Sequence, residues 1–107
     1  GNTDTLLLAL LQGEPMYGYQ IVKEVDMRSS GYFAFKEGTL YPALHRLEKA
    51  KLIEGRWEDT PNNVRRRYYL VTAKGQQALA DRLSEWQKFS RAMDSIMLPV
   101  PQGLEEA

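Results

Sequence analysis

The spacing of apolar residues predicts three helices in the first half of the chain. Residues 5–12 are apolar almost all the way round, which is typical of a helix that is buried on most sides. Residues 17–28 and about 39–50 repeat apolar side chains at intervals of three and four, so each helix should bury one stripe. The stripes consist of Gly18, Ile21, Val22 and Val25 in the second helix and Leu40, Ala43, Leu44 and Leu47 in the third. Thr39 is expected to cap the third helix, because Pro42 then falls in the first turn.

After the third helix, apolar residues recur at every second position, which is the spacing of a strand. Ile53, Gly55 and Trp57 alternate with charged residues, which predicts a strand at 53–58, and residues 65–72 predict a second strand. The turn-forming residues 59–64 complete a hairpin. Thr72 is expected to cap a long helix at 73–98, which two prolines end.

This order predicts a mainly α (α+β) fold, a winged helix-turn-helix with a two-stranded β wing and a long C-terminal dimerisation helix. Residues 1–72 would form the DNA-binding domain, residues 73–98 the dimerisation helix and residues 99–107 a flexible tail. The absence of cysteine excludes a disulfide framework and a thiolate zinc site. The longest apolar run, residues 6–11, is far shorter than the roughly 20 residues that span a bilayer. No signal peptide is recognised either, so a cytoplasmic location is expected.

The net charge is zero, but the charges are unevenly distributed. Residues 36–67 contain eight Lys or Arg against five Asp or Glu, which gives this segment a charge of +3 and the flanks −3. A neutral chain with such a middle segment can present one positive face.

The third helix and the hairpin together hold the residues expected to bind DNA. A recognition helix buries one face and offers polar or basic groups on the other. The outer face of the third helix fits this description, and the hairpin adds three consecutive arginines able to contact phosphates. Tyr17, Lys23 and Lys36 could add phosphate contacts, although a simply solvated surface explains these three equally well. The predicted DNA-binding residues are Tyr17, Lys36, Thr39, Tyr41, Pro42, His45, Arg46, Lys49, Arg65, Arg66 and Arg67.

The last helix carries an apolar stripe with heptad spacing, which is typical of a coiled coil. A lone helix of this kind needs a partner helix. The leucine-rich first helix also has more apolar surface than one protomer is expected to bury, so a homodimer is expected. The predicted dimerisation residues are Leu7, Leu10, Leu79, Leu83, Trp86, Phe89, Met93, Ile96 and Met97. Two interpretations of Trp86 and Phe89 stay open: they fill the dimer interface, or they flank a slot for a flat aromatic ligand.

The residues give no support to catalysis. His45 is the single histidine, and no carboxylate is spaced to orient it on its helix. Phosphate-binding glycine loops, nucleophile elbows and metal-ligand spacings are all missing from the sequence. An enzyme, a metal site and a cofactor are therefore not expected.

Three motifs resemble the PadR family of transcriptional regulators over about residues 5–97. These are Glu37-Gly38-Thr39-Leu40-Tyr41-Pro42-Ala43-Leu44-His45-Arg46-Leu47-Glu48, Pro15-Met16-Tyr17-Gly18-Tyr19, and Arg65-Arg66-Arg67-Tyr68-Tyr69 followed by Thr72 and Gly75. The family often has Gly-Gly in the wing turn and a Gly before the first strand. Here these places are occupied by Asn63-Val64 and Lys51. Asn can adopt a glycine-like backbone and Val64 cannot, so a different wing tip is expected.

The resemblance implies a dimeric repressor that binds a palindromic promoter site and often controls its own gene. The single C-terminal helix is similar to that of the compact subfamily, some members of which bind planar drugs between two tryptophans at the position of Trp86. The expected function is therefore a ligand-responsive, sequence-specific repressor, with double-stranded DNA, a second copy of the chain and a planar aromatic effector as partners. Two alternatives remain: a winged-helix protein-interaction module that does not bind DNA, and a dimer that mainly sequesters planar hydrophobic drugs.

Overall fold

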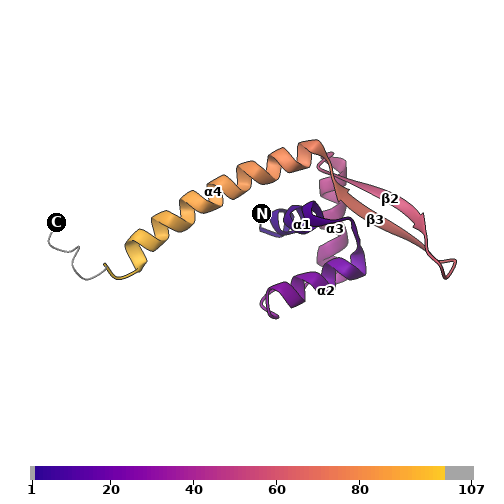
Figure 1. Ribbon diagram of the computed structural model, residues 1–107, viewed down its shortest axis with the longest axis horizontal. Coiled ribbons are helices and arrows are strands. Elements are labelled where there is room, and N and C mark those ends of the chain that lie inside the picture. The colour runs from indigo at the N-terminus through magenta and orange to yellow at the C-terminus, as the bar shows by residue number, and fades with distance from the viewer. Residues whose placement is uncertain (1, 101–107) are drawn as a thin grey trace.

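The computed structural model describes residues 2–100 and confirms a winged helix-turn-helix. Helices α1, α2 and α3 come first, a hairpin follows, and one long helix, α4, ends the fold (Figure 1). The predicted tail falls largely outside the described residues, of which only Pro99 and Val100 belong to it. The elements are α1 (Asn2–Gly13), β1 (Met16–Tyr17), α2 (Gly18–Arg28), α3 (Glu37–Lys49), β2 (Ile53–Asp59), β3 (Arg65–Val71) and α4 (Ala73–Met97).

The core lies where the three short helices meet the sheet and the first turns of α4. The predicted stripe of α3 is buried in full, and α2 buries Gly18, Ile21 and Val25. Four leucines of α1, together with Leu79 of α4, complete this core. The first turns of α4 thus belong to the same packed unit as the winged helix.

The sheet has three strands in the order β1-β3-β2, all antiparallel, so the expectation of two strands is incomplete. The additional strand is β1, which pairs Met16 with Tyr69 and Tyr17 with Tyr68. Two residues are too few to show a period of two in the sequence. Buried Met16 holds this edge against the core.

Helix α3 begins earlier than predicted. Lys36 is the N-cap, and its carbonyl accepts from the N–H groups of Thr39 (3.0 Å) and Leu40 (2.9 Å). The prediction that Thr39 caps the helix is therefore wrong, and Pro42 lies inside the helix. Proline has no N–H for the carbonyl four residues earlier, that of Gly38, but Gly38 is exposed and water can bind that oxygen.

Helix α3 ends in a Schellman turn, which leads into the wing. Lys51 has a φ of 67°, so it occupies the left-handed region where the family often has glycine. Its N–H donates to the Glu48 carbonyl (3.0 Å), and the N–H of Leu52 donates to the Leu47 carbonyl (2.9 Å). Both leucines are buried, which supplies the apolar contact that accompanies this motif.

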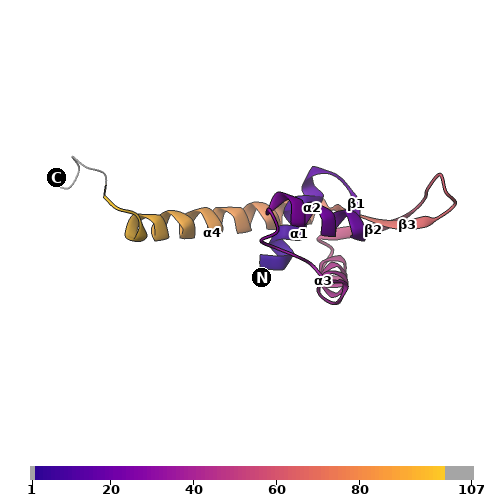
Figure 2. The same cartoon turned by 90° about the horizontal axis from the view of Figure 1, so that it is seen from below.

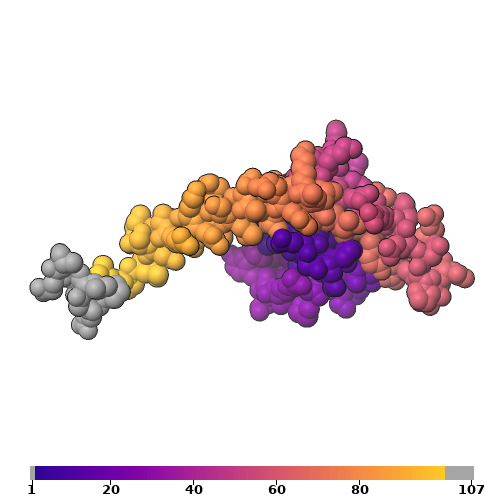
Figure 3. Space-filling model, turned by 45° about the horizontal axis from the view of Figure 1, so that its top comes forward, coloured from indigo at the N-terminus to yellow at the C-terminus, as the bar shows by residue number. Residues whose placement is uncertain are grey.

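Helix α4 leaves the body after its first turns and projects into solvent (Figures 1 and 3). The Cα radius of gyration is 18.0 Å, whereas a compact chain of this length has about 13 Å. The prediction that Thr72 caps α4 is confirmed, because its side-chain oxygen accepts from the Gly75 N–H (3.0 Å).

Candidate nucleic-acid interface

The outer face of α3 is exposed, as predicted. Tyr41, Pro42, His45, Arg46 and Lys49 all reach solvent, and Thr39 lies in the exposed first turn. Lys36 is exposed at the N-cap. Helix α3 lies on one side of the sheet (Figure 2). Because its stripe of Leu40, Ala43, Leu44 and Leu47 is buried, the opposite face of the helix looks away from the core.

Two residues of this face also contact other helices. Arg46 donates through Nη2 to Asp4 Oδ1 of α1 (3.1 Å), and the side chain of Asp4 is only 18% exposed. Tyr41 lies over Gly18 at the start of α2, where a Cβ would collide with its hydroxyl group. The orientation of the recognition helix is therefore tied to both α1 and α2.

The three wing arginines divide between the two faces of the sheet, because successive strand residues point to opposite sides. Arg65 and Arg67 share one face with Trp57, which lies directly opposite Arg67 in β2. Their guanidinium carbons lie 5.5 and 5.6 Å from the centre of the Trp57 ring. Arg67 also forms an ion pair with Glu48 of α3, so we call this the α3 face of the wing.

Arg66 lies on the opposite, outer face of the sheet. Its guanidinium carbon is 4.3 Å from the centre of the Tyr17 ring, and Tyr17 packs edge-on against Tyr68 at 5.4 Å. Tyr17 was expected to be the first residue of the second helix, but it is the N-cap of α2 and belongs to β1. The structure therefore does not bring Arg66 and Tyr17 together with the outer face of α3.

Glu48 connects the recognition helix to the wing. Its Oε2 atom accepts from the Gly55 N–H (3.1 Å) and from Arg67 Nη2. Gly55 leaves room for this arrangement, since a Cβ there would come within 2.5 Å of Arg67 Nε. Burial raises the pKa of the neighbouring Tyr69 hydroxyl, and the Arg67 guanidinium offsets only part of that increase.

The wing tip closes with a single left-handed residue. Asn63 has a φ of 58°, which confirms that asparagine substitutes here for glycine. Val64 does not have a positive φ, as expected for a residue with a branched Cβ. Thr60 closes the turn instead, because its Oγ1 donates to the Val64 carbonyl (2.7 Å) and accepts from the Val64 N–H (3.2 Å).

The apolar stripe of α4 is mostly uncovered beyond its first turns. Trp86 is 58% exposed and Ile96 81%, and Leu83, Phe89, Met93 and Met97 are exposed as well. Leu7, Leu10 and Leu79, however, are buried in the core of the same protomer. The prediction that these three residues contact a partner is therefore corrected, because α1 and the start of α4 already cover each other.

A groove of about 860 Å³ lies between α1 and α4. Leu6 and Ala9 of α1, Phe33 and the side chains of Trp86 and Phe89 form much of its wall, and the two aromatic rings are 6.0 Å apart. Arg82 also lines it, and its Nη1 atom is buried without a hydrogen-bond partner among the described residues.

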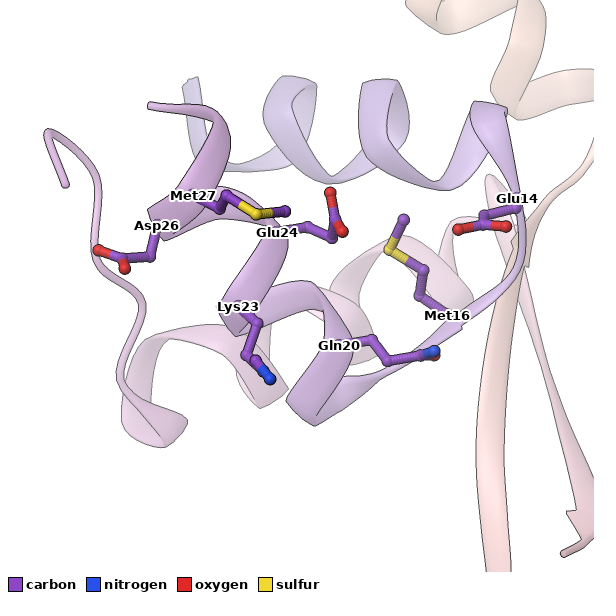
Figure 4. Close-up of a pocket in the computed structure, with 7 residues that line it drawn as sticks. All are labelled: Glu14, Met16, Gln20, Lys23, Glu24, Asp26 and Met27. Atoms are coloured by element: carbon purple, nitrogen blue, oxygen red, sulfur yellow. The ribbon is translucent and has the colours of Figure 1, made fainter. Parts of the chain in front are cut away.

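A second hollow, of about 400 Å³, lies between α2 and the segment before it (Figure 4). Two of its polar side chains are already engaged: Gln20 accepts from the Tyr17 N–H (3.0 Å), and Glu24 pairs with Arg28 (2.8 Å). Within residues 2–100, no group of three or more metal-binding side chains could hold an ion. No helix in this part of the chain is long and apolar enough to cross a membrane.

An exposed recognition helix joined to a basic wing defines a winged helix-turn-helix regulator of the kind that reads DNA. The chain belongs to the transcriptional regulator PadR-like family, whose model matches residues 7–81. Family membership confirms the expectation of a transcription regulator rather than an enzyme.

Individual relatives agree with this assignment. An uncharacterised Lysinibacillus sphaericus protein is 34% identical over 105 residues, which cover 98% of this chain and 93% of that protein. A PadR family transcription regulator from Clostridium difficile R20291 has a TM-score of 0.79 at 32% identity, with 91% of this chain and 99% of that chain covered. Bacillus subtilis PadR, solved in complex with operator DNA, has a TM-score of 0.73 at 21% identity, with 97% of this chain and 52% of that chain covered. At this identity the likeness shows the shared fold alone.

Proposed function

We propose that this protein is a sequence-specific DNA-binding repressor that acts as a homodimer on a palindromic promoter site. The observation that carries the proposal is the junction at Glu48, which joins the exposed face of α3 to the arginine-bearing α3 face of the wing. A recognition helix in the major groove and a wing on the adjacent backbone then form one continuous surface. Because chromosomal DNA is the proposed partner, the protein would act in the cytoplasm.

The proposed roles differ among the predicted residues. Tyr41, His45 and Lys49 face base edges or flanking phosphates, together with Thr39, Pro42 and the N-cap residue Lys36. Arg46 joins them when it exchanges Asp4 for DNA, and Arg65 contacts phosphate from the wing. Arg67 mainly holds the wing on α3, and Arg66 and Tyr17 would reach only a backbone that passes the outer face.

The uncovered stripe of α4 supports the homodimer. Large apolar side chains along a projecting helix are unusual on a monomer, and a second copy supplies the complementary stripe. A two-fold dimer then matches a palindrome whose half-sites are about 34 Å apart or a multiple of that distance. The dimer residues in this proposal are Leu83, Trp86, Phe89, Met93, Ile96 and Met97.

The groove between α1 and α4 supports a response to a planar aromatic ligand. Its volume is within the range of small-molecule sites, and its wall includes two adjacent aromatic rings. The unpartnered Nη1 of Arg82 offers a donor to an acceptor atom that comes from outside the protomer. Binding there would shift the dimer between spacings of its recognition helices and so release DNA.

A titration with DNA from the protein's own promoter tests the function, with random DNA as competitor and at two salt concentrations. We expect specific binding of one dimer per palindrome, with an affinity that falls linearly with salt on logarithmic axes. Lys49→Ala and Arg65→Ala should each reduce the salt slope by about one if these side chains touch phosphate. Binding no tighter than to random DNA, with no salt slope, would instead favour the protein-interaction module. Tryptophan quenching by planar aromatics without DNA binding would favour the sequestering dimer.

A further inference from the structure

The wing carries one large aromatic side chain that the core does not use. Trp57 is 56% exposed, although it shares its sheet face with buried Ile53. The core ends near Gly55, so this face of the sheet continues past the core into solvent. The indole therefore lies on the α3 face of the wing, the face expected to meet DNA.

The two arginines that flank Trp57 have different electrostatic partners. Arg67 is held by Glu48, and both side chains of this pair are about one-third exposed. Among residues 2–100, the ion-pair partner of Arg65 is Asp59 at 3.5 Å, and both of these side chains are largely exposed. Such a surface pair is weak and readily screened, so Arg65 can exchange the carboxylate for another anion.

The indole restricts the directions that the Arg65 guanidinium can take. A planar guanidinium stacks on an aromatic face, and this contact removes part of the side chain's conformational freedom before any ligand arrives. A side chain held in this way loses less entropy when it binds than a free arginine does. Trp57 thus prepares one cation of the wing for binding.

We propose that Trp57 is a DNA-contacting and positioning residue of the wing. Its indole holds Arg65 toward a phosphate of one strand, and its exposed surface packs against the adjacent deoxyribose. The partner is the backbone of double-stranded DNA, because a guanidinium fork matches phosphate and an apolar ring matches the sugar beside it. This inference rests on the proposed DNA-binding function.

Fluorescence can test the contact directly, because the chain has two tryptophans. Full-length Trp86→Phe protein reports on Trp57 alone and is titrated with a random-sequence duplex at low salt. We expect the Trp57 emission to change, and its quenching by acrylamide to fall about twofold, as the duplex covers the ring. The Trp57→Phe variant is the matched control, in which Trp86 on α4 should show neither change.

Affinity measurements test the positioning role. Trp57→Ala should weaken duplex binding about fivefold and lower the salt slope by about one, as Arg65→Ala does. Trp57→Phe should keep most of the affinity, because a phenyl ring still supports the guanidinium. The double variant of Trp57→Ala and Arg65→Ala should bind duplex at most about twofold more weakly than either single variant does, because both changes remove the same contact.

The outcomes separate this inference from the function on which it rests. Unchanged Trp57 emission and quenching at saturating duplex overturns the contact while DNA binding stands. A Trp57→Ala variant with the wild-type fold, affinity and salt slope overturns it as well, and strictly additive losses overturn the positioning role. Failure of the wild-type protein to bind any duplex at low salt overturns the proposed function and this inference together.

Discussion

Replacement of Lys51 by glycine should stabilise the protein, although the change removes a side chain. Lys51 is exposed and has a φ of 67°, a conformation that residues with a Cβ rarely adopt. The Schellman hydrogen bonds at the end of α3 hold it there. Glycine would keep these backbone bonds and remove the steric cost.

Two opposing contributions set the change in the free energy of unfolding that Lys51→Gly should cause. A left-handed residue with a Cβ costs about 1–2 kcal/mol, which the substitution recovers. Glycine also increases the conformational entropy of the unfolded chain, which costs about 0.4–1 kcal/mol. The central values of these two contributions differ by about 0.8 kcal/mol. This net gain corresponds to a rise in Tm of about 3–6 °C for a domain of this size.

Thermal unfolding followed by circular dichroism measures this gain at one fixed chain concentration, because dimerisation would make Tm depend on concentration. Ala50→Gly is the matched control, since Ala50 is the exposed neighbour and has a right-handed φ of −78°. That variant should lose stability by up to about 1 kcal/mol. Lys51→Ala should change little, because it keeps the strained backbone. An unchanged Tm in Lys51→Gly, or an equal rise in Ala50→Gly, would show that the left-handed backbone at Lys51 carries no steric cost.

Three further substitutions test the links between elements. Gly55→Ala should lose about 0.5–1 kcal/mol of stability in urea unfolding, because the new Cβ pushes the flexible end of Arg67 away from Glu48; an unchanged midpoint would show that the Arg67–Glu48 pair does not stabilise the wing. Asp4→Asn should strengthen duplex binding about two- to fivefold, because it frees Arg46 and removes an acidic group, and weaker binding would show that the ion pair instead aligns Arg46 for DNA. Ile96→Lys should shift sedimentation toward the monomer at micromolar concentration without lowering helix content, and an unchanged dimer would place the interface elsewhere.

The parts of the fold that could be predicted are those with long, regular patterns. The stripes of α2 and α3, the hairpin and the cap of α4 follow from spacing and from local hydrogen-bonding chemistry. The start of α3 was missed because Pro42 suggested a later cap, whereas the structure exposes the carbonyl that proline leaves unbound. Strand β1 was missed because its two residues form a strand only through their pairing with β3.

The exposure of the candidate residues on α3 was predictable from the sequence, but the arrangement of the candidate residues was not. Strand alternation already separates Arg66 from Arg65 and Arg67, yet only the paired partners reveal which face α3 covers. The exposure of Trp57 depends on where the core ends along β2, which no alternation pattern encodes. Glu48 was not a candidate, since its role arises from residues that lie 7 and 19 positions further along the chain.

The connections between α3 and the wing imply that, in the proposed function, each protomer would present one rigid surface to DNA. Glu48 binds the wing to α3, and Thr72 binds the end of β3 to the start of β2 by donating to the Lys51 carbonyl (2.7 Å) and, through its N–H, to the Leu52 carbonyl (3.1 Å). In a homodimer, the adjustable quantity is then the separation of the two surfaces, which α4 sets.

Affinity should therefore depend sharply on the spacing of the half-sites. Insertion of one base pair between them should weaken binding about tenfold or more, because a rigid pair of surfaces cannot follow the displaced half-site. Gly55→Ala loosens the link at Glu48 and should flatten this dependence, even if it also weakens binding to the unaltered site. Equal spacing dependence in the two proteins would show that the wing and α3 adjust independently of that link. In that case, a ligand between α1 and α4 would be able to change the shape of the reading surface itself as well as the separation of the two surfaces in the dimer.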